Sequence, residues 1–469
     1  MLEDQPNPAT EVSPATDTIA AISTPPGRGG IGIVRLSGPM AASIAAQLVT
    51  LRQALEHGRT RLADVLDESA DDDRPAPARI DEAVVTFFRA PNSYTGEDLV
   101  EIAAHGSPVV LDLLLRRALA LGARLAEPGE FTQRAFLAGR LDLTQAEAIR
   151  DLIEAQTLTQ ARQAASQMGG ALSRRVAPLK QSLVELIALI EVGIDFAEDD
   201  VDVAPQQEIA RRIEELSTPL ARLEASFSRG RIVHDGLTLA IVGRPNAGKS
   251  SLFNRLIERD RAIVTATPGT TRDTVSERIS LDGIPLELVD TAGLREAHEE
   301  AEKLGVVRSR EALADAGLVL IVLDATQTLN DEERILLADL EGRPALVAIN
   351  KSDLAAPASL ASELNGLPAI ATSALTGEGI FALREHILAL ASGGAASEPG
   401  MLTNLRHHQA VTTALHAVND AAQANANVIP HEMILLDLYR ALWALDSLTG
   451  QTTSDDILNL IFSTFCIGK

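Results

Sequence analysis

The sequence predicts a multidomain chain, with an α+β domain first, an all-α helical domain next, and an α/β domain inserted into the helical one. Three observations support this: mixed strand and helix patterns before residue 140, helical periodicity after it, and strands alternating with helices over about 236–390. Helical periodicity returns after the Gly/Ala/Ser-rich stretch SGGAASEPG. The same pattern also fits two independent helical domains on either side of the α/β domain.

Composition limits the classes of protein to which the chain can belong. With 469 residues, 46% of them hydrophobic and only 3% aromatic, it can bury several mainly aliphatic cores. No apolar run is long enough to cross a membrane, the acidic start is unlike a signal peptide, and a single cysteine excludes an intrachain disulfide. We therefore expect a soluble cytoplasmic protein. The net charge of −24 argues against a general nucleic-acid-binding surface, so RNA would need a local basic patch or a partner.

The first domain shows strand-like runs separated by turns, and one clear helix start. Ser107 suits the N-cap position and Pro108 the first helical position of an amphipathic run. The tail 1–16 and the acidic, Pro-containing stretch 63–79 are predicted to be loops. We expect strands at 18–22, 31–38 and 81–91 and within 93–107, and helices at 40–54 and 108–122.

The helical domain opens with TQAE at residues 144–147, a pattern typical of a capping box formed by Thr144 and Glu147. This helix is expected to run to about residue 168, with further helices over about 172–196 and 205–229. The predicted domains are 1–140, 141–235, 236–392 and 393–469, of which the second and fourth form one helical domain.

The stretch from Leu237 to Ser250 carries the first sign of chemistry. A strand pattern ends at Val242, the next residues spell G-x-x-x-x-G-K-S, and helical periodicity follows. This order predicts a phosphate-binding loop, because backbone amides and the positive end of the helix dipole both favour phosphate. Lys249 is then placed for the β- and γ-phosphates, and the Ser250 hydroxyl for Mg²⁺.

Further nucleotide motifs follow in order. Asp290 begins D-T-A-G, where its carboxylate would reach Mg²⁺ through water and the Gly293 amide would sense the γ-phosphate. Thr271, in PGTTRD, is the candidate second hydroxyl ligand of Mg²⁺. The motif NKSD at 350–353 indicates guanine, because an Asp carboxylate accepts hydrogen bonds from guanine N1–H and N2–H₂. Ser373-Ala374 fits the loop whose amide meets the guanine oxygen.

Together these motifs predict a P-loop domain that binds GTP. The candidate GTP-binding residues are Asn246, Ala247, Gly248, Lys249, Ser250, Ser251, Thr265, Ala266, Thr267, Pro268, Gly269, Thr270, Thr271, Asp290, Thr291, Ala292, Gly293, Asn350, Lys351, Ser352, Asp353, Ser373 and Ala374.

The residue after D-T-A-G indicates that GTP hydrolysis needs a further group to stabilise its transition state. Leu294 follows D-T-A-G where many small GTPases carry a water-orienting glutamine, and leucine cannot hydrogen-bond water. The side-chain carbonyl of Asn246 and backbone carbonyls of 265–270 would hold K⁺ where an arginine's charge would otherwise lie. The alternatives are an Asn246 that is satisfied locally, and a charge supplied by Arg272 or Arg295.

Several stretches together resemble one family closely: PPGRGGIGIVRLSG, PNSYTGEDLVEI, HGSPVVLDLLL, PGEFTQRAFLAGRLDLTQAEAI, GRPNAGKSSL, PGTTRD, DTAGLRE and the terminal FCIGK. In this order they are similar to the MnmE (TrmE) family, the tRNA-modification GTPases of bacteria and mitochondria. The likeness runs from about Thr18 to Lys469 and leaves out the acidic tail and 63–79.

The resemblance implies an N-terminal domain that binds folate and dimerises, a helical domain, and an inserted Ras-like G domain. It implies that the FAD protein MnmG joins the homodimer in a heterotetramer-type complex to modify the wobble uridine of tRNA. A carboxymethylaminomethyl or aminomethyl group is added at carbon 5, with 5-formyltetrahydrofolate or a related tetrahydrofolate supplying the one-carbon unit. GTP hydrolysis in the family needs K⁺-dependent dimerisation of the G domains.

The resemblance also assigns site residues by position. Glu302 matches the glutamate that orients the attacking water, although its own context is that of one acid in a solvated acidic run. Lysine is also found at the position of Arg140, which is a mild departure. Without the family, Arg35 and Glu101 would be strand residues at an edge or interface. The matched ligands are Asn246, Thr265, Thr267 and Thr270 for K⁺, Ser250 and Thr271 for Mg²⁺, and Arg35, Glu101, Arg140 and Lys469 for folate.

Cys466 has two interpretations. Its neighbours Phe462, Phe465 and Ile467 predict a buried small hydrophobe. Its place in the FCIGK tail would instead put it near the folate, where it would take part in the chemistry.

Two other functions compete with this hypothesis. A ribosome-assembly switch GTPase of the Era/EngA type would share the G domain, but such proteins usually bring a KH-type or second G domain. A folate-binding scaffold with a vestigial GTPase disagrees with the intact nucleotide motifs.

Overall fold

The computed structural model describes residues 17–67, 78–195, 205–257, 276–290, 316–340, 342–356, 360, 363–364, 366–392, 398–451 and 455–468. The chain divides into two compact units, Met1–Arg150 with Thr449–Lys469, and Asp151–Leu448. The first unit therefore extends past residue 140 to Arg150 and also includes the C-terminal residues Thr449–Lys469. The domain boundaries predicted from the sequence remain a proposal.

The first unit is built on a seven-stranded sheet in the order β3-β4-β5-β6-β2-β1-β7, antiparallel except where β1 meets β7. Buried side chains of α1 and α2 share one cluster with alternate residues of the strands, such as Val34, Ile102 and Leu114. The elements are β1 (Ile19–Ile22), β2 (Gly29–Ser37), α1 (Ala41–Leu48), β3 (Thr50–Leu51), β4 (Thr60–Asp67), β5 (Ala78–Phe88), β6 (Leu99–Gly106), α2 (Pro108–Ala120) and β7 (Arg124–Leu125).

Two predictions for this sheet were wrong. Residues 63–67 belong to β4 rather than to an acidic loop, because Ala63 and Val65 alternate inward and are buried against β5. The helix expected over 40–54 ends at Leu48, where Val49 turns extended (φ −139°, ψ 150°) and leads into β3. Ser107 does occupy the N-cap position of α2 with Pro108 after it, but its side chain makes no capping bond.

The helices that follow the sheet begin at α3 (Glu130–Leu137), α4 (Leu143–Glu154) and α5 (Leu158–Met168). The single helix predicted from residue 144 to 168 is therefore two. The predicted Thr144–Glu147 box is also wrong, because Asp142 Oδ1 accepts from Gln145 N (3.0 Å) and Gln145 Oε1 accepts from Asp142 N (2.9 Å). These reciprocal bonds cap α4 two residues before the predicted pair, and a further capping box lies at the start of α5, between Thr157 and Gln160. In the first unit, α16 (Asp455–Ser463) contributes Leu458 and Phe462 to a cluster with Leu143.

The second unit contains α6 (Ala171–Asp195), α7 (Gln206–Ala225), α8 (Phe227–Asp235), α14 (Leu405–Ala426) and α15 (His431–Thr449). Buried residues from before and after the α/β domain, among them Leu186, Leu216, Val418 and Leu438, form one core. Because the two helical segments share this core, they form one helical domain and not two independent ones. The helix predicted over 205–229 divides at Ser226 into α7 and α8.

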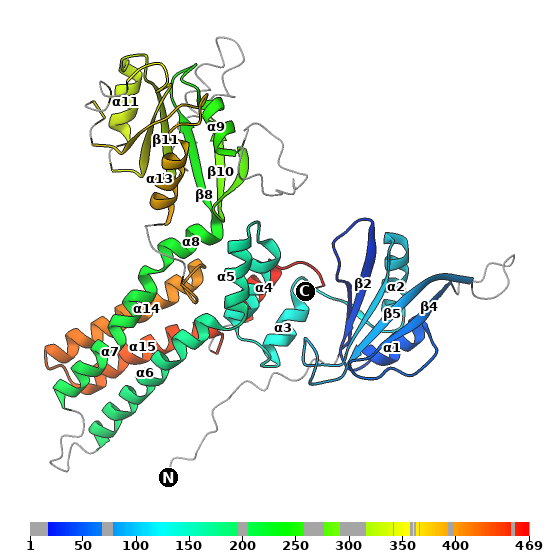
Figure 1. Cartoon of the computed structure of the whole chain (residues 1–469). Coiled ribbons are helices and arrows are strands. Elements are labelled where there is room, and N and C mark those ends of the chain that lie inside the picture. Colours follow the sequence, from blue (N-terminus) through cyan, green and yellow to red (C-terminus); the bar gives the residue numbers. More distant parts are fainter. Residues whose placement is uncertain are drawn as a thin grey trace. The chain divides into compact units, whose positions relative to one another are not determined.

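The α/β domain has a six-stranded sheet in the order β13-β12-β11-β8-β10-β9, parallel except for the β9–β10 hairpin. Side chains such as Leu239 pack with α9 and α13, while Ile321 packs with α11, so helices cover both faces (Figure 1). This is a Ras-like P-loop α/β fold. The elements are β8 (Leu237–Val242), α9 (Lys249–Ile257), β9 (Ser276–Leu281), β10 (Ile284–Asp290), β11 (Leu318–Asp324), α11 (Asp331–Asp339), β12 (Ala345–Asn350), β13 (Ala369–Ala371) and α13 (Ile380–Ser392).

In the described part of the chain, no helix combines the length and the hydropathy that a membrane span requires.

Candidate functional site

The phosphate-binding loop lies between β8 and α9, at the carboxyl end of the parallel strands. Asn246 is exposed and adopts a left-handed backbone conformation (φ 63°). Gly248 (φ 91°) has no space for a side chain, since a Cβ atom there would lie 2.2 Å from Asn350 Nδ2. Lys249 is 7% exposed, and its ammonium donates to the carbonyls of Gly243 (2.8 Å) and Arg244 (2.9 Å). The ammonium of Lys249 and the N-terminal end of α9 therefore both bring positive charge to this loop, which favours an anion.

Asn350 joins the phosphate loop to the base-recognition motif. It ends β12 with 2% of its surface exposed, and its amide group donates to Ala247 O (2.9 Å) and accepts from Ala374 N (3.0 Å). The sequence predicted all three residues, and the structure brings them together at one buried side chain. Arg255 of α9 holds the last of these loops in addition, donating to the carbonyls of Ala374 and Leu375 (both 2.8 Å).

Lys351 also adopts a left-handed conformation (φ 65°), and its ammonium donates to Asp324 Oδ2 at 2.7 Å. Asp324 is the last residue of β11, which neighbours β12 in the parallel sheet. The sequence analysis missed this carboxylate. An acid that closes a continuous apolar strand could have revealed it, because the carboxyl ends of neighbouring parallel strands meet at one edge.

A second contact that the sequence analysis missed fixes the phosphate loop from outside. Arg244 donates to both carboxylate oxygens of Glu333 (2.7 and 2.5 Å) and to Thr328 O (2.7 Å). Glu333 is 3% exposed, and its carboxylate also accepts from Asn330 N in the capping box of α11. A buried bidentate pair of this kind holds the loop with defined geometry.

Part of the predicted site lies outside the described residues, so the structure tests none of it. For Asp290 the backbone closes β10, but its side chain is not described. The residues concerned are Thr265, Ala266, Thr267, Pro268, Gly269, Thr270, Thr271, Arg272, Thr291, Ala292, Gly293, Leu294, Arg295, Glu302 and Lys469.

In the first unit, Arg35 and Glu101 face each other across β2 and β6. Arg35 Nε and Nη2 both donate to Glu101 Oε1, at 3.0 and 2.7 Å, and Nη1 donates to Gly468 O at 3.2 Å. The guanidinium also lies 5.7 Å from the ring centre of Tyr94 and 5.6 Å from that of Phe131. Two residues predicted to touch folate thus form one charged pair beside aromatic rings, next to the end of the chain.

The C-terminal tail reaches this pair by backbone contacts. Gly468 (φ 90°) lies so close to β1 that a Cβ atom would be 2.7 Å from Ile22 O. Cys466 O accepts from Gly129 N, and the Cys466 side chain is exposed. The expectation of a buried cysteine was wrong, because Phe462 and Phe465 fill the core there instead. Arg140 is exposed, and within the described residues no hydrogen bond joins its side chain to Arg35 or Glu101.

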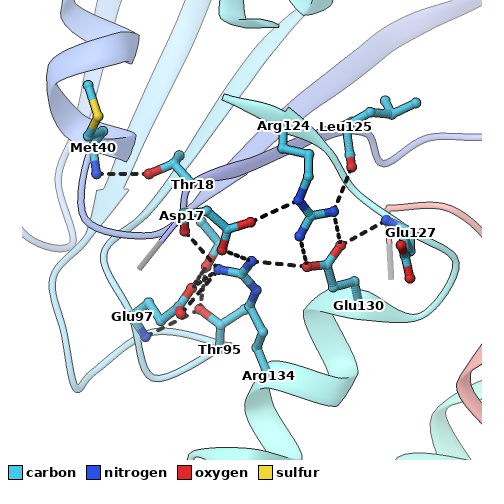
Figure 2. Close-up of polar contacts among 11 residues, drawn as sticks. Asp17, Thr18, Met40, Thr95, Glu97, Arg124, Leu125, Glu127, Glu130 and Arg134 are labelled. Atoms are coloured by element: carbon cyan, nitrogen blue, oxygen red, sulfur yellow. Dashed lines mark hydrogen bonds and ion pairs between the residues drawn. The ribbon is translucent and has the colours of Figure 1, made fainter. Parts of the chain in front are cut away.

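A network of charges beside this region went unnoticed in the sequence (Figure 2). Arg134, with 6% of its side chain exposed, donates to Asp17 Oδ1 (2.8 Å), Glu130 Oε1 (3.0 Å) and Glu97. Arg124 donates to the same Asp17 and Glu130 carboxylates. Burial alone would raise the pKa of Glu130, but hydrogen bonds from Arg124, Glu127 N and Arg134 outweigh it and lower that pKa. These hydrogen bonds therefore favour the ionised form of Glu130.

The described residues fit the predicted ligands in part. Lys249 and the amides at the start of α9 suit a polyphosphate, and Ser250, exposed in the first turn, presents a hydroxyl of the kind that binds Mg²⁺. For K⁺, the loop offers the exposed Asn246. In the first unit both bonds from Arg35 fall on Glu101 Oε1, so Oε2 can accept from the amino and amide groups of a pterin.

A glycine loop after the first parallel strand and an Asn-Lys-x-Asp motif after a later one define a P-loop G domain. Two family models match most of the chain, "GTP-binding protein TrmE N-terminus" over residues 18–140 and "MnmE helical domain" over residues 143–466, a range that includes the G domain. The tRNA modification GTPase MnmE of Koribacter versatilis is 56% identical over 460 residues, covering 97% of this chain and 99% of the relative. That of Symbiobacterium thermophilum is 43% identical over 458 residues, with 97% and 99% covered. The chain belongs to the MnmE family.

Solved structures match parts of the chain. The G domain of the T. maritima FeoB iron transporter is 28% identical, covers 33% of this chain and 98% of its own, and has a TM-score of 0.24. A variant of Aquifex aeolicus Era bound to GDP and AlF₄⁻ is 26% identical, covers 39% of this chain and 66% of its own, and has a TM-score of 0.28.

Proposed function

We propose that this chain is a GTP-hydrolysing enzyme of tRNA modification. The observation that carries the proposal is Asn350, whose buried amide joins the phosphate loop at Ala247 to the base loop at Ala374. A single folded site thus contains both halves of a guanine-nucleotide pocket. Relatives that match almost the whole chain are named tRNA modification GTPases, which supports the second half of the proposal.

In this proposal each nucleotide motif has one task. Lys249 and the amides of the loop neutralise the β- and γ-phosphates, because aligned donors in a site closed to water stabilise developing charge. Ser250 and Thr271 hold Mg²⁺, with Asp290 acting through water. Asp353 selects guanine, and a backbone amide of the Ser373-Ala374 loop meets its oxygen.

Hydrolysis needs a positive charge and a positioned water. Asn246 and the carbonyls of Thr265, Thr267 and Thr270 would hold K⁺, which supplies the charge near the phosphates. Glu302 would orient the attacking water in place of the glutamine that Leu294 replaces. The two G domains of a homodimer would close over this site, which excludes water from it.

The first unit would bind the tetrahydrofolate that supplies the one-carbon unit, such as the 5-formyl derivative. Glu101 would accept from the pterin, while Arg35, Arg140 and Lys469 would meet its anionic groups. The proximity of Gly468 to Arg35 supports a role for the tail, since the two are joined by a hydrogen bond of 3.2 Å. Cys466, exposed in this tail, is available for chemistry at the bound group.

This chain would bind tRNA together with a partner protein. A chain of net charge −24 repels a polyanion, so we assign much of the RNA contact to MnmG, the FAD protein of the family. The product would be a wobble uridine carrying a carboxymethylaminomethyl or aminomethyl group, made in the cytoplasm. No described feature favours the alternative of a ribosome-assembly switch.

The experiment that tests this proposal compares GTP hydrolysis by the purified protein in K⁺ and in Na⁺ at equal ionic strength. We expect a rate at least about tenfold higher in K⁺, because one well-placed charge is worth more than about 1.4 kcal/mol of barrier. Asn246→Ala should remove the preference and leave the slow Na⁺ rate. Equal rates in both salts would contradict the K⁺ mechanism and direct attention to Arg272 and Arg295.

A further inference from the structure

The connection between β11 and α11, residues 325–330, touches both halves of the nucleotide site. Arg244 of the phosphate loop donates to Gln327 Oε1 (2.6 Å) and Thr328 O (2.7 Å) in this connection. Asp324, the residue before it, accepts from Lys351 of the base motif. The connection itself contains none of the predicted nucleotide-binding residues. Ala325 N in addition donates to Asn350 O (2.9 Å), so the described contacts join the connection to the phosphate loop and to the start of the base motif.

The Asp324 carboxylate is buried, and both of its oxygens accept hydrogen bonds from neighbouring groups. It is 2% exposed, and its Oδ1 accepts from Thr326 N (2.9 Å) and Thr326 Oγ1 (2.6 Å). Its Oδ2 accepts from Lys351 Nζ at 2.7 Å and, at the longer distance of 3.5 Å, from Gln327 Nε2. Burial alone would raise the pKa of Asp324, but the hydrogen bonds from Lys351 and Thr326 outweigh it and lower that pKa. The carboxylate is therefore charged at neutral pH. The two hydrogen bonds from Thr326 fix its orientation independently of Lys351.

Lys351 needs such an anchor. Its φ of 65° lies in the left-handed region, which residues with a side chain seldom adopt. Its side chain has several rotatable bonds and is 32% exposed, so without a partner the ammonium would sample many positions. The bond to Asp324 restricts both the side chain and the backbone segment that carries Asn350 and Asp353.

We propose that Asp324 is a positioning residue for nucleotide binding, which acts by holding the Lys351 ammonium and so ordering the 350–353 segment before the base arrives. The inference rests on the proposed function, because it concerns the affinity of the same site. An ordered segment binds more tightly, since less conformational freedom is lost when the ligand enters.

The substitution Asp324→Asn tests this contact selectively. Asparagine keeps one carbonyl oxygen, which can go on accepting from Thr326 N and Oγ1. Its amide nitrogen would then face Lys351 Nζ, and two donors cannot form a hydrogen bond. The change thus removes the anchor of Lys351 while it preserves the local turn.

The experiment is a double-mutant cycle of Asp324→Asn and Lys351→Ala, read as the dissociation constants of GDP and of GTP by titration calorimetry. We expect Asp324→Asn to weaken both nucleotides about tenfold in the wild-type background and less than about twofold in the Lys351→Ala background. The rate of hydrolysis at saturating GTP should change less than about twofold, because the phosphates are held elsewhere. Asp331→Asn, an exposed acid on α11, is the matched control and should change neither constant.

Equal losses in the two backgrounds would overturn the inference, as would full affinity in Asp324→Asn. If Asp324→Asn does not fold, as judged by thermal unfolding, Thr326→Val carries the same cycle, because it removes one donor that orients the carboxylate. A weaker loss that again vanishes with Lys351→Ala supports the inference, and a loss that persists contradicts it. Failure of the wild-type protein to bind GDP or GTP would instead refute the proposed function.

Discussion

The two candidate sites of this chain are assembled in different ways. In the G domain, each predicted nucleotide residue that the structure describes lies at the end of a parallel strand, in the loop that directly follows one, or in the first turn of α9, and short stretches supply whole groups of them. In the first unit, Arg35 and Glu101 come from two strands 66 residues apart, and the tail carbonyl that Arg35 meets is 433 residues away.

The difference teaches what holds each site in place. The phosphate loop is shaped by backbone conformation and by bonds to its own carbonyls, as those of Lys249 show. The pair in the first unit is placed by strand register, and α3, which carries Arg134 and its charged network, also places Phe131 beside Arg35. We therefore expect the first site to fail mainly when its own residues are changed, and the second when its surroundings are changed.

The largest effect is expected from Lys249→Ala. Removal of this ammonium should lower the rate of GTP hydrolysis by about 100-fold or more, because a preorganised donor to developing phosphate charge is lost. The melting temperature should change little, since the ammonium of Lys249 donates to two carbonyls of its own loop. Single-turnover hydrolysis and thermal unfolding measure the two quantities. A collapse of stability together with activity would show that the loop is not held by its backbone alone.

A smaller effect, on stability rather than turnover, is expected from Glu130→Gln. Two arginines lose a charged partner, which should cost about 2 kcal/mol of unfolding free energy in the first unit at pH 7. Since the folded-state pKa of Glu130 is lowered below 4.5, its contribution is present above that pH and lost as the pH falls through the folded value. The destabilisation should therefore shrink toward acid pH in urea titrations. Asp112→Asn, which breaks an exposed pair with Arg116, is the control and should cause no measurable change.

The smallest effect is expected from Glu101→Gln. The glutamine can still accept from Arg35 but presents a weaker acceptor to a pterin, so affinity for 5-formyltetrahydrofolate should fall about tenfold. GTP hydrolysis in the absence of folate should be unchanged. Equilibrium titration with the folate measures the first, and an unchanged affinity would remove Glu101 from the proposed contacts. A parallel loss in the Glu130→Gln variant would show that the surrounding network shapes this site, as the comparison predicts.

Much of the fold could be predicted from periodicity. The strands β1, β2, β5 and β6, the helix α2, and the alternation of strands and helices in the G domain all follow from apolar patterns read locally. The wrong prediction for residues 63–67 shows where local patterns are not sufficient. Residues 63–67 have an acidic composition, yet Ala63 and Val65 are buried, because β4 pairs with β5 and these two side chains join the hydrophobic cluster shared with α1 and α2. Composition does not record a neighbour that is distant in sequence.

The sequence by itself determined the phosphate loop and the Asn-Lys-x-Asp motif, because their chemistry depends on a continuous backbone in a set order. Only the tertiary structure decided that Asp324 anchors Lys351, that Glu333 fixes Arg244, and that Arg35 meets both Glu101 and Gly468. These contacts join residues brought together by strand order and register. Two charged residues far apart in the sequence cannot be recognised as a pair from the sequence alone, because only the fold sets the distance between them.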